Sequence, residues 1–265
     1  MRPLFFSLCC LLAATGLFAE DKPVPPLPEK ENFHLFLLVG QSNMAGRGKV
    51  TPADREPDPR VLMFNKEGRW TPAVDPMHFD KPAAVGVGLG RTFGREIAKA
   101  RPGVTIGLIP CAIGGSPIET WEPGAFDKAT KTHPWDDAMR RARAALPSGV
   151  LKGILWHQGE SDANAERAPL YSRRLHQLIA RFRTELAAPE VPFLAGQMGL
   201  FPGKPWSPEK KIVDRVHRDL PEQIAHTAFV SAEGLTDKGD QVHFDAESYR
   251  ELGRRYAAAY LEMEP

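Results

Sequence analysis

The chain has few cysteines, and their positions argue against a disulfide framework. Of the three cysteines, Cys9 and Cys10 fall in an apolar N-terminal segment and Cys111 is the last. If that segment is removed, one cysteine is left and no internal disulfide can form, so the stability of the protein must come from its hydrophobic core. We interpret Cys111 as a small buried residue.

The chain also lacks an excess of charge of either sign. Lys and Arg number 34 and Asp and Glu number 33, which gives a formal net charge of +1, and the two signs are interspersed along the sequence. Proteins that bind nucleic acid present a basic surface, so we expect no nucleic-acid partner. A length of 265 residues with 42% hydrophobic residues is sufficient for one domain with its own core.

Long apolar runs are absent except at the N-terminus. A nearly unbroken apolar run at residues 4–18 lies between Arg2 and the small residue Ala19, a pattern typical of a secretory signal peptide cleaved after Ala19. It predicts a secreted or periplasmic protein with no stable membrane insertion after cleavage. A retained membrane anchor is the alternative, although the run is somewhat short for one. Residues 20–32 contain four prolines and are predicted to be a linker, which leaves residues 33–265 as the main domain.

Two common catalytic signatures are missing. The sequence has no HExxH motif and no paired-cysteine ligand set, so we expect no metal ion, although His157, Glu160, Asp162 and His243 are residue types that bind metals. It also lacks the Gly-x-Ser-x-Gly elbow of the α/β-hydrolase fold, because the fifth position is Met44.

The first feature with catalytic potential is a serine that follows a short apolar run. Leu35–Val39 is typical of a strand buried on both faces of a parallel sheet, and Gly40 permits a sharp turn after it. Ser42 therefore lies just past the carboxyl end of a strand, where open α/β sheets bind ligands. Ser42 is a candidate nucleophile, and an ordinary turn or N-cap serine is the alternative.

The rest of the chain alternates between predicted strands and predicted helices. Such alternation requires right-handed crossovers onto a parallel sheet, so the sequence predicts a three-layer α/β/α sandwich. Residues 47–85 have no clear pattern and are predicted to be a long irregular loop that forms a substrate wall or a surface excursion. Further strands are expected at 104–109, 153–156, 193–197 and 228–231, and helices at 86–101, 135–146, 168–186, 209–225 and after 245.

Three further polar segments are expected at the same edge of the sheet as Ser42. They are Gly114-Gly115-Ser116, the loop 157–162 and the turn 237–245. Acyl transfer needs N–H donors for the developing oxyanion, and the candidates are the backbone N–H of Ser42, that of Gly115 or its neighbour, and the side-chain amide of Gln158. A Gly-Gly pair can also be a simple turn, and the nearby Trp121 can either floor a sugar pocket or belong to the core.

His243 is the candidate base, because it lies in a polar turn before the last helix. Asp240 precedes it by three residues, close enough for a tight turn to bring the carboxylate to the second imidazole nitrogen. Alternatively, Asp240 is a solvated turn residue and His243 is merely a neighbour of the helix N-terminus.

Four segments together resemble a known family. They are GQSNMAGRG at 40–48, GGSPIETW at 114–121, HQGESD at 157–162 and DQVH at 240–243. They are similar to the SGNH-hydrolase superfamily, in particular its sialate O-acetylesterase and acetylxylan esterase branch, carbohydrate esterase family 6. The resemblance spans about 40–260 and implies a flavodoxin-like, five-stranded parallel sheet, no cofactor, and removal of acetyl groups from sugar hydroxyls through an acyl-serine.

The resemblance also implies roles for individual residues. It makes Ser42 the nucleophile, His243 the base, and the glycines of the GGS segment and Gln158 the oxyanion donors. Gln158 stands where most of the superfamily has asparagine, a departure that this branch shares. Asp240 matches the Asp-x-x-His pattern of the superfamily, and Glu160 is the alternative partner of the histidine.

Alternatives to this function remain open in the sequence. One is an SGNH lipase or thioesterase that acts on longer acyl esters, and another is a catalytically silent carbohydrate-binding protein. The expected partner is an acetylated carbohydrate, either of the xylan or of the sialic acid type, and no pattern indicates an oligomeric state. Asn43 and Arg47 are expected to support the nucleophile loop.

Overall fold

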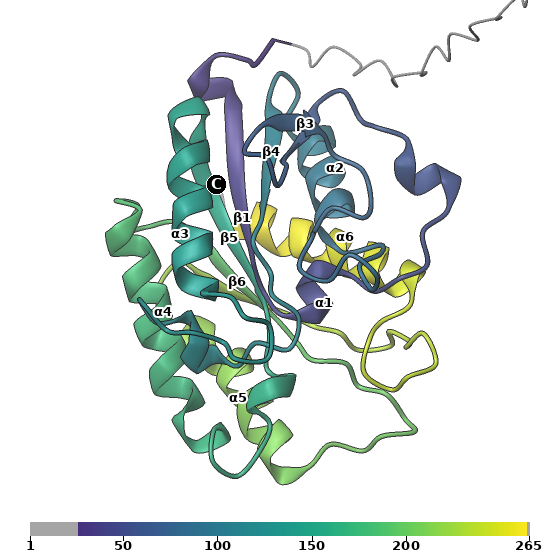
Figure 1. The fold of residues 1–265 in the computed structure, drawn as a ribbon, viewed down its shortest axis with the longest axis vertical. Coiled ribbons are helices and arrows are strands. Elements are labelled where there is room, and N and C mark those ends of the chain that lie inside the picture. Colours follow the sequence, from purple (N-terminus) through teal and green to yellow (C-terminus); the bar gives the residue numbers. More distant parts are fainter. Residues whose placement is uncertain (1–25, 264–265) are drawn as a thin grey trace, which may run out of the picture.

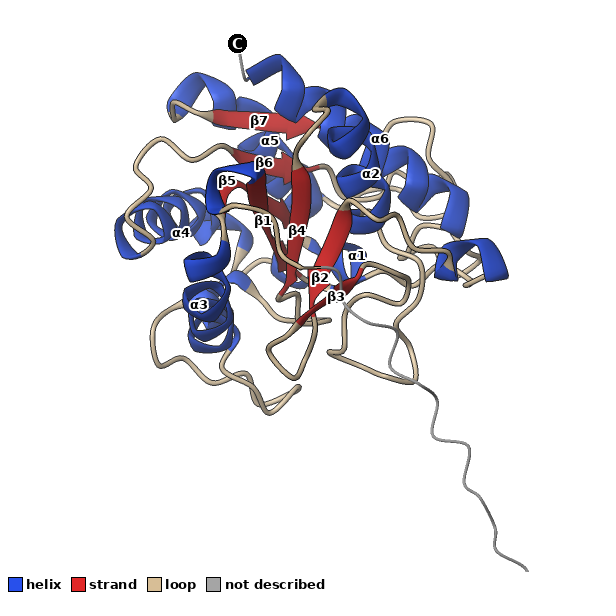
Figure 2. Ribbon diagram, turned by 90° about the horizontal axis from the view of Figure 1, so that it is seen from above, coloured by secondary structure: helices blue, strands red, loops and turns tan. Residues whose placement is uncertain are grey.

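A sheet of seven strands lies between two layers of helices (Figures 1 and 2). The computed structural model describes residues 26–263, so the predicted signal peptide and its cleavage site lie outside the described residues. The strands are β1 (Phe33–Gly40), β2 (Val61–Phe64), β3 (Trp70–Pro72), β4 (Thr105–Pro110), β5 (Val150–His157), β6 (Phe193–Gly196) and β7 (Thr227–Val230). The α-helices are α1 (Ser42–Ala45), α2 (Gly90–Ala100), α3 (Pro134–Ala145), α4 (Tyr171–Glu185), α5 (Pro208–Gln223) and α6 (Ala246–Met263). Short 3-10 helices are η1 (Lys30–Asn32), η2 (Pro52–Arg55), η3 (Ile118–Trp121), η4 (Leu146–Ser148), η5 (Glu160–Asp162) and η6 (Ala168–Leu170). The predicted α/β/α class is confirmed.

The centre of the sheet is β1, which pairs in parallel with β4 on one side and β5 on the other. The strand order is β3-β2-β4-β1-β5-β6-β7, and β3 alone is antiparallel, paired with β2. Gly40 at the end of β1 lies opposite His157 at the end of β5. The carboxyl ends of the central strands therefore meet at one edge, where the polar segments following them gather.

The predicted number of five strands and the irregular loop at 47–85 are both wrong. The region contains η2 and the β2–β3 hairpin, which extends the sheet beyond β4. Strands of four and three residues are too short for a period-2 pattern to emerge among the surrounding prolines and charges. The predicted linker also contains regular structure, because Lys30–Asn32 form η1 immediately before β1.

Two hydrophobic cores, one on each face of the sheet, account for the apolar run of β1. Alternate side chains of a strand point to opposite faces. Leu35, Leu37 and Val39 therefore pack with α3, α4 and α5 on one side. Phe36 and Leu38 pack with α2 and α6 on the other. A strand covered on both faces needs no polar residue, which is why its sequence does not alternate.

Trp121 belongs to the first of these cores. Its side chain is fully buried and meets the ring of Trp156 edge to face, with centroids 5.3 Å apart. It cannot form the floor of a sugar pocket, so of the two interpretations of this residue the core one is right.

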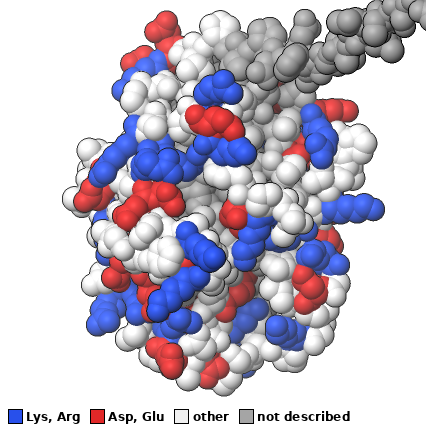
Figure 3. Space-filling view, in the orientation of Figure 1, with Lys and Arg blue, Asp and Glu red and all other residues white. Residues whose placement is uncertain are grey.

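The surface mixes charges of both signs. Figure 3 shows basic and acidic side chains interspersed on the face it presents. Within residues 26–263, no helix combines the length and the apolar composition needed to cross a membrane.

Candidate active site

Ser42 is the first residue of α1, directly after the turn that ends β1. The N–H of Gln41 donates to the carbonyl of His157 at 2.9 Å, which ties this turn to β5. Gly40 has φ of +129°, and a Cβ at this position would lie 2.2 Å from the His157 carbonyl oxygen. Only glycine fits so close to the neighbouring strand, and the turn it permits presents Ser42 at the sheet edge.

Ser42, His243 and Asp240 form a continuous chain of hydrogen bonds. His243 Nε2 lies 3.0 Å from Ser42 Oγ, and His243 Nδ1 lies 2.7 Å from Asp240 Oδ2. The other carboxylate oxygen of Asp240 accepts from the backbone N–H groups of His243 and Val242, at 2.8 and 3.0 Å. The structure thus brings Ser42 to the Asp240–His243 pair, which lies about 200 positions further along the chain.

The carboxylate of Asp240 stays ionised in this arrangement. Partial burial by itself would raise its pKa, but the hydrogen bonds from the His243 side chain and from the two backbone N–H groups outweigh burial and hold the pKa well below its usual range. A permanently charged carboxylate at Nδ1 favours the tautomer that carries its proton there, so Nε2 is free to accept the serine proton.

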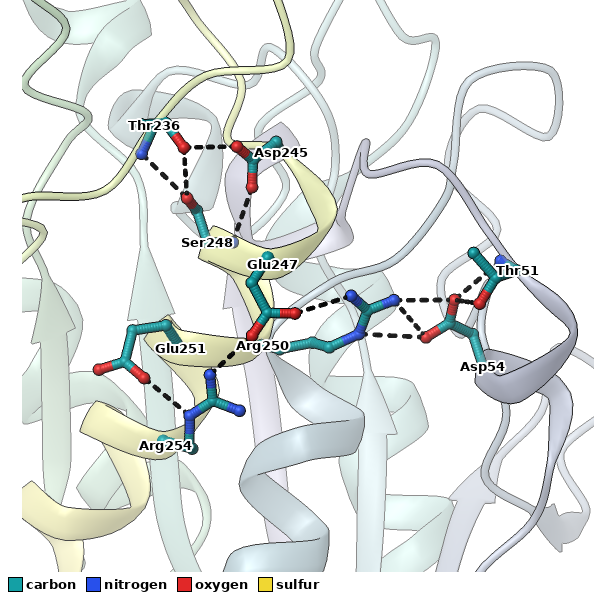
Figure 4. Close-up of polar contacts among 9 residues, drawn as sticks. All are labelled: Thr51, Asp54, Thr236, Asp245, Glu247, Ser248, Arg250, Glu251 and Arg254. Carbon is teal, nitrogen blue, oxygen red and sulfur yellow. Dashed lines mark hydrogen bonds and ion pairs between the residues drawn. The ribbon is translucent and has the colours of Figure 1, made fainter.

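The turn that carries His243 is held by the start of α6. Asp245 accepts from the N–H of Ser248 at 2.8 Å and from the hydroxyl of Thr236, and both contacts are drawn in Figure 4. The backbone closes the same turn, because Lys238 N–H donates to the His243 carbonyl at 3.0 Å. Arg250, one helical turn further along α6, pairs with Asp54 in η2 at 2.8 Å, which links the helix to the segment after the nucleophile loop (Figure 4).

In the GGS segment after β4, the N–H of Gly115 lies between two backbone N–H groups that donate hydrogen bonds within the protein. Gly114 N–H donates to Asp80 Oδ2 at 2.7 Å, and Ser116 N–H donates to the Ile113 carbonyl at 3.2 Å. Gly115 has φ of +89°, a left-handed conformation that favours glycine. A Cβ built on Gly115 would meet no protein atom closer than Lys81 Nζ at 3.9 Å, so space is open beside this residue.

The structure does not place Gln158 as the oxyanion donor that the sequence predicts. Its Nε2 donates to Asp162 Oδ2 at 2.5 Å and to the Ser116 carbonyl at 3.2 Å, and its Oε1 accepts from the Tyr171 hydroxyl at 2.8 Å. Both amide hydrogens are therefore in use, and the side chain is fully buried. Asp162 takes the hydrogen bond that an oxyanion would need, because a buried carboxylate requires donors where water is scarce.

The sequence places Asp162 in a polar loop and among the residue types that bind metals, but it does not indicate that Asp162 is buried. Burial raises the pKa of Asp162 to about 6, although the hydrogen bonds from Gln158 and from the Ile118 N–H oppose that rise. Asp162 thus joins the loop after β5 to η3.

Glu160 is turned toward Asn43 rather than toward His243. Asn43 Nδ2 donates to Glu160 Oε1 at 2.6 Å and to the Val242 carbonyl at 3.1 Å, and Asn43 Oδ1 accepts from Tyr249 at 2.6 Å. The asparagine is fully buried and connects the nucleophile loop, the loop after β5, the histidine turn and α6.

His157 has no catalytic geometry despite its position in the loop motif. It is fully buried, its Nδ1 lies 3.2 Å from the Tyr256 hydroxyl, and burial lowers its pKa to about 3. Across residues 26–263, no group of three or more His, Cys, Asp or Glu side chains is arranged to hold a metal ion.

The family described as "Carbohydrate esterase, sialic acid-specific acetylesterase" matches residues 32–262, nearly all of the described chain. The chain belongs to this family. The protein is therefore a carbohydrate esterase, a carboxylic ester hydrolase, and the resemblance noted in the sequence is confirmed.

Relatives of this esterase are similar over most of their length. Probable carbohydrate esterase At4g34215 from Arabidopsis thaliana is 31% identical over 263 residues, which cover 91% of this chain and 95% of the relative. The X-ray structure of the same plant protein has a TM-score of 0.76 at 30% identity and covers 88% of this chain and 98% of that one. XAC1771, a carbohydrate acetylesterase from Xanthomonas citri, has a TM-score of 0.68 at 21% identity, with 86% of this chain and 56% of that chain covered. At this lower identity the likeness shows a shared fold.

Two further residues, Gln41 and Asp80, hold the loops of the candidate site together and were not predicted from the sequence. Gln41 Oε1 accepts from the N–H of Ser161 at 3.2 Å and so ties the nucleophile loop to η5. Asp80 accepts from Arg47 at 2.8 Å as well as from Gly114, so one carboxylate joins the GGS segment to the loop after α1. Gln41 could have been suspected from its position beside the serine, but Asp80 lies in the region without a readable pattern.

Proposed function

We propose that the protein is an exported serine esterase that removes O-acetyl groups from carbohydrates through an acetyl-serine intermediate. Membership of a carbohydrate esterase family supports an acetylated carbohydrate as the substrate. The observation that carries the mechanism is the hydrogen-bonded chain from Ser42 Oγ through His243 to Asp240, with distances of 3.0 and 2.7 Å.

In the first half of the reaction, Ser42 Oγ attacks the acetyl carbonyl carbon and its proton passes to His243 Nε2. The negative charge that develops on the carbonyl oxygen is stabilised by the backbone N–H of Ser42 and, in our assignment, that of Gly115, whose neighbours are engaged elsewhere. The tetrahedral intermediate collapses when the bond to the sugar oxygen breaks and the imidazolium returns its proton to that oxygen. The sugar leaves as an alcohol.

In the second half, water replaces the sugar. His243 accepts a proton from the water as its oxygen attacks the acetyl carbonyl, and the same proton then returns to Ser42 Oγ as the ester bond breaks. Acetate is released and the free serine is restored. Asp240 keeps its negative charge in both halves and stabilises the imidazolium.

The function is tested by acetate release from a panel of acetylated glycans that includes acetylated xylan and O-acetylated sialic acid. We expect acetate from at least one of them, and Ser42→Ala should lower kcat by at least a thousandfold, because the nucleophile is lost. The active glycan in the panel would also decide between the xylan and the sialic acid types.

A series of p-nitrophenyl esters separates this proposal from its alternatives. We expect acetate to be preferred, whereas a preference for octanoate would indicate a lipase or thioesterase. A fluorophosphonate that fails to label Ser42, together with no turnover, would instead point to a silent carbohydrate-binding protein.

Export is the second part of the proposal and depends on residues 1–19. If the signal peptide is cleaved as the sequence predicts, the mature protein isolated after export begins at Glu20. N-terminal sequencing that finds residues 1–19 still attached would favour the membrane anchor.

A further inference from the structure

An open cavity of about 750 Å³ lies between α2, α6 and residues 51–60, and no residue of the triad lines it. Six of the side chains that line it are cationic, namely Arg60, Arg91, Arg95, Lys99, Arg250 and Arg254. Three carboxylates also line it, those of Asp54, Asp58 and Glu96. The lining therefore has an excess of three positive charges, whereas the formal net charge of the whole chain is only +1.

Most of these cations follow the period of the two helices. Arg91, Arg95 and Lys99 are four residues apart and so share one face of α2. Arg250 and Arg254 have the same spacing on α6 (Figure 4). The two helices are in contact, and like charges at this spacing destabilise a helix. Two rows of like charge on adjacent helices therefore call for a compensating negative charge.

Carboxylates of the protein neutralise the row on α6. Arg250 pairs with Asp54 at 2.8 Å. Arg254 pairs with Glu247 at 2.9 Å and with Glu251 at 2.7 Å (Figure 4). These two arginines are therefore compensated without a ligand.

The other cations of the cavity are poorly compensated. Arg95 Nε lies 3.8 Å from Asp58 Oδ2, too far for a hydrogen bond. Within residues 26–263, Arg60, Arg91 and Lys99 have no carboxylate oxygen within 4.0 Å of their side-chain nitrogens. The excess of positive charge is thus concentrated on α2 and on the start of β2.

Arg91 shows most clearly that a negative charge is missing. It is 6% exposed, and its guanidinium donates to the carbonyls of Ala53 and Glu56, which are uncharged acceptors. Asp75 attracts it from further away, but burial raises the pKa of Asp75 to about 7, so this carboxyl group is only partly ionised at neutral pH. A buried cation without a full counter-charge costs free energy, and an anion bound in the cavity would supply that charge.

The lining also indicates which kind of anion fits. No aromatic residue lines the cavity and Ala53 is its only apolar residue, so it offers little to an acyl chain or a stacked ring. Guanidinium groups match the oxygens of a phosphate group in pairs. Each phosphate monoester carries a charge of about −1.5 to −2 at neutral pH, so two of them offset the three excess positive charges. A cavity of this size accommodates a small organic molecule rather than a single ion.

From this juxtaposition we propose that the cavity is a second binding site, for a small polar molecule that carries two phosphate groups. The exposed side chains of Arg95, Lys99 and Arg254 bind the phosphate oxygens at the rim, and Arg60 and Arg91 add positive charge from within. The inference goes beyond the proposed esterase function and does not depend on it.

Calorimetric titration of the purified protein tests this site. The probe is fructose 1,6-bisphosphate, and inorganic phosphate and unphosphorylated fructose are titrated in parallel at low ionic strength, where screening is weak. We expect the bisphosphate to bind with a Kd below about 1 mM, inorganic phosphate to bind about tenfold more weakly, and fructose not to bind. Arg95→Gln and Lys99→Gln should each weaken binding of the bisphosphate by about fivefold or more, because a hydrogen bond to a charged group is lost.

Arg140→Gln provides the matched control. It removes the same charge from an exposed side chain of α3, which packs on the opposite face of the sheet from α2. The Kd of the bisphosphate should stay within about twofold, because a distant exposed charge is screened. All three substituted positions are exposed, so circular dichroism should show an unchanged fold in every variant.

Three results would overturn the site. The first is no binding of the bisphosphate at millimolar concentration, and the second is binding no tighter than that of inorganic phosphate. The third is binding that Arg95→Gln and Lys99→Gln weaken no more than Arg140→Gln does. None of these measurements uses ester hydrolysis, so a failure of the site is distinguishable from a failure of the proposed function.

Discussion

Asp240 and Glu160 are the two carboxylates that the sequence offers as partners of His243, and their contacts in the structure differ. Asp240 Oδ2 is 2.7 Å from His243 Nδ1, whereas Glu160 Oε1 is 2.6 Å from Asn43 Nδ2. Geometry therefore supports Asp240 as the residue that orients the imidazole, and it supports Glu160 as a residue that fixes the loop beside the nucleophile.

Replacing each carboxylate by its amide separates these roles. Asp240→Asn should lower kcat by a hundredfold or more, because an amide can stabilise the wrong imidazole tautomer and carries no charge to stabilise the imidazolium. Glu160→Gln should cost less than tenfold in kcat. Steady-state kinetics with p-nitrophenyl acetate would measure both, and equal or reversed losses would transfer the orienting role to Glu160.

Asp75 is a buried carboxyl group away from the triad. It is 3% exposed, and its backbone N–H donates to the Asp54 carbonyl at 3.0 Å. Burial raises the pKa of Asp75 to about 7, even though the positive charge of Arg91 and a hydrogen bond from the Gly88 N–H act in the opposite direction. The folded protein therefore holds this proton over a pH range in which the unfolded chain releases it.

We expect a pH dependence of stability from this group. Because its pKa is raised from 3.8 to about 7, its contribution is fully present below pH 3.8 and is lost as the pH rises through 7. The loss corresponds to about 1.4 kcal/mol for each unit of pKa shift. Asp75→Asn should remove this part of the pH dependence. Chemical denaturation of both proteins between pH 4 and 8 measures it. If the difference in their free energies of unfolding stays constant over that range, the prediction is wrong.

At the scale of single elements, α6 supports both the histidine turn and the nucleophile loop. Tyr249 donates to Asn43, and Tyr256 donates to the Trp156 carbonyl at 2.7 Å in β5. The helix comes very close to α2, because a Cβ on Gly253 would lie 2.5 Å from the Leu89 carbonyl oxygen. Gly253 therefore sets the distance between the two helices.

The usual effect of Gly→Ala in a helix should be reversed at this position. In an open helix the change stabilises by about 1 kcal/mol, whereas at Gly253 the methyl group meets backbone atoms of α2 that cannot rotate away. We expect Gly253→Ala to lower the free energy of unfolding by about 1–3 kcal/mol, as for other overpacked sites.

Ala258, exposed on the same helix, provides the comparison. Ala258→Gly should cost about 1 kcal/mol from helix propensity alone. If urea denaturation shows that Gly253→Ala is more stable, α2 and α6 can move apart without cost and the prediction is wrong.

At the scale of the whole molecule, the sheet separates two hydrophobic cores and contributes side chains to both. Residues of β1 belong to each core, so neither helical layer can detach without exposing the central strand. Cys111 lies at the end of β4 in this region, is 7% exposed, and has its pKa raised to about 11 by burial. Its thiol is therefore protected in the folded protein.

Thiol reactivity should report on global unfolding. In the protein that begins at Glu20, Cys111 is the single cysteine, and we expect it to react with a thiol reagent only when the fold opens. The labelling rate should rise with guanidinium in step with the loss of circular dichroism. Reductant should leave Tm unchanged, and rapid labelling of the native protein would contradict the burial of this residue.

The sequence by itself determined the family and the fold class, and it proposed the three residues of the triad, because all of these depend on local patterns. A strand covered on both faces is an uninterrupted apolar run, and a catalytic serine, aspartate or histidine needs a particular residue type at a particular strand end. The Asp-x-x-His pair can also be recognised in the sequence, because two residues that are three positions apart can meet across a single turn.

Only the tertiary structure decided what each amide and carboxylate bonds to. Gln158 has the right chemistry for an oxyanion donor, yet its hydrogens go to Asp162, which burial deprives of water, and to Ser116. For a related reason, the sequence left the place of Trp121 undecided and did not predict the short strands β2 and β3. The burial of a side chain and the pairing of an edge strand depend on neighbouring segments that are distant in the chain.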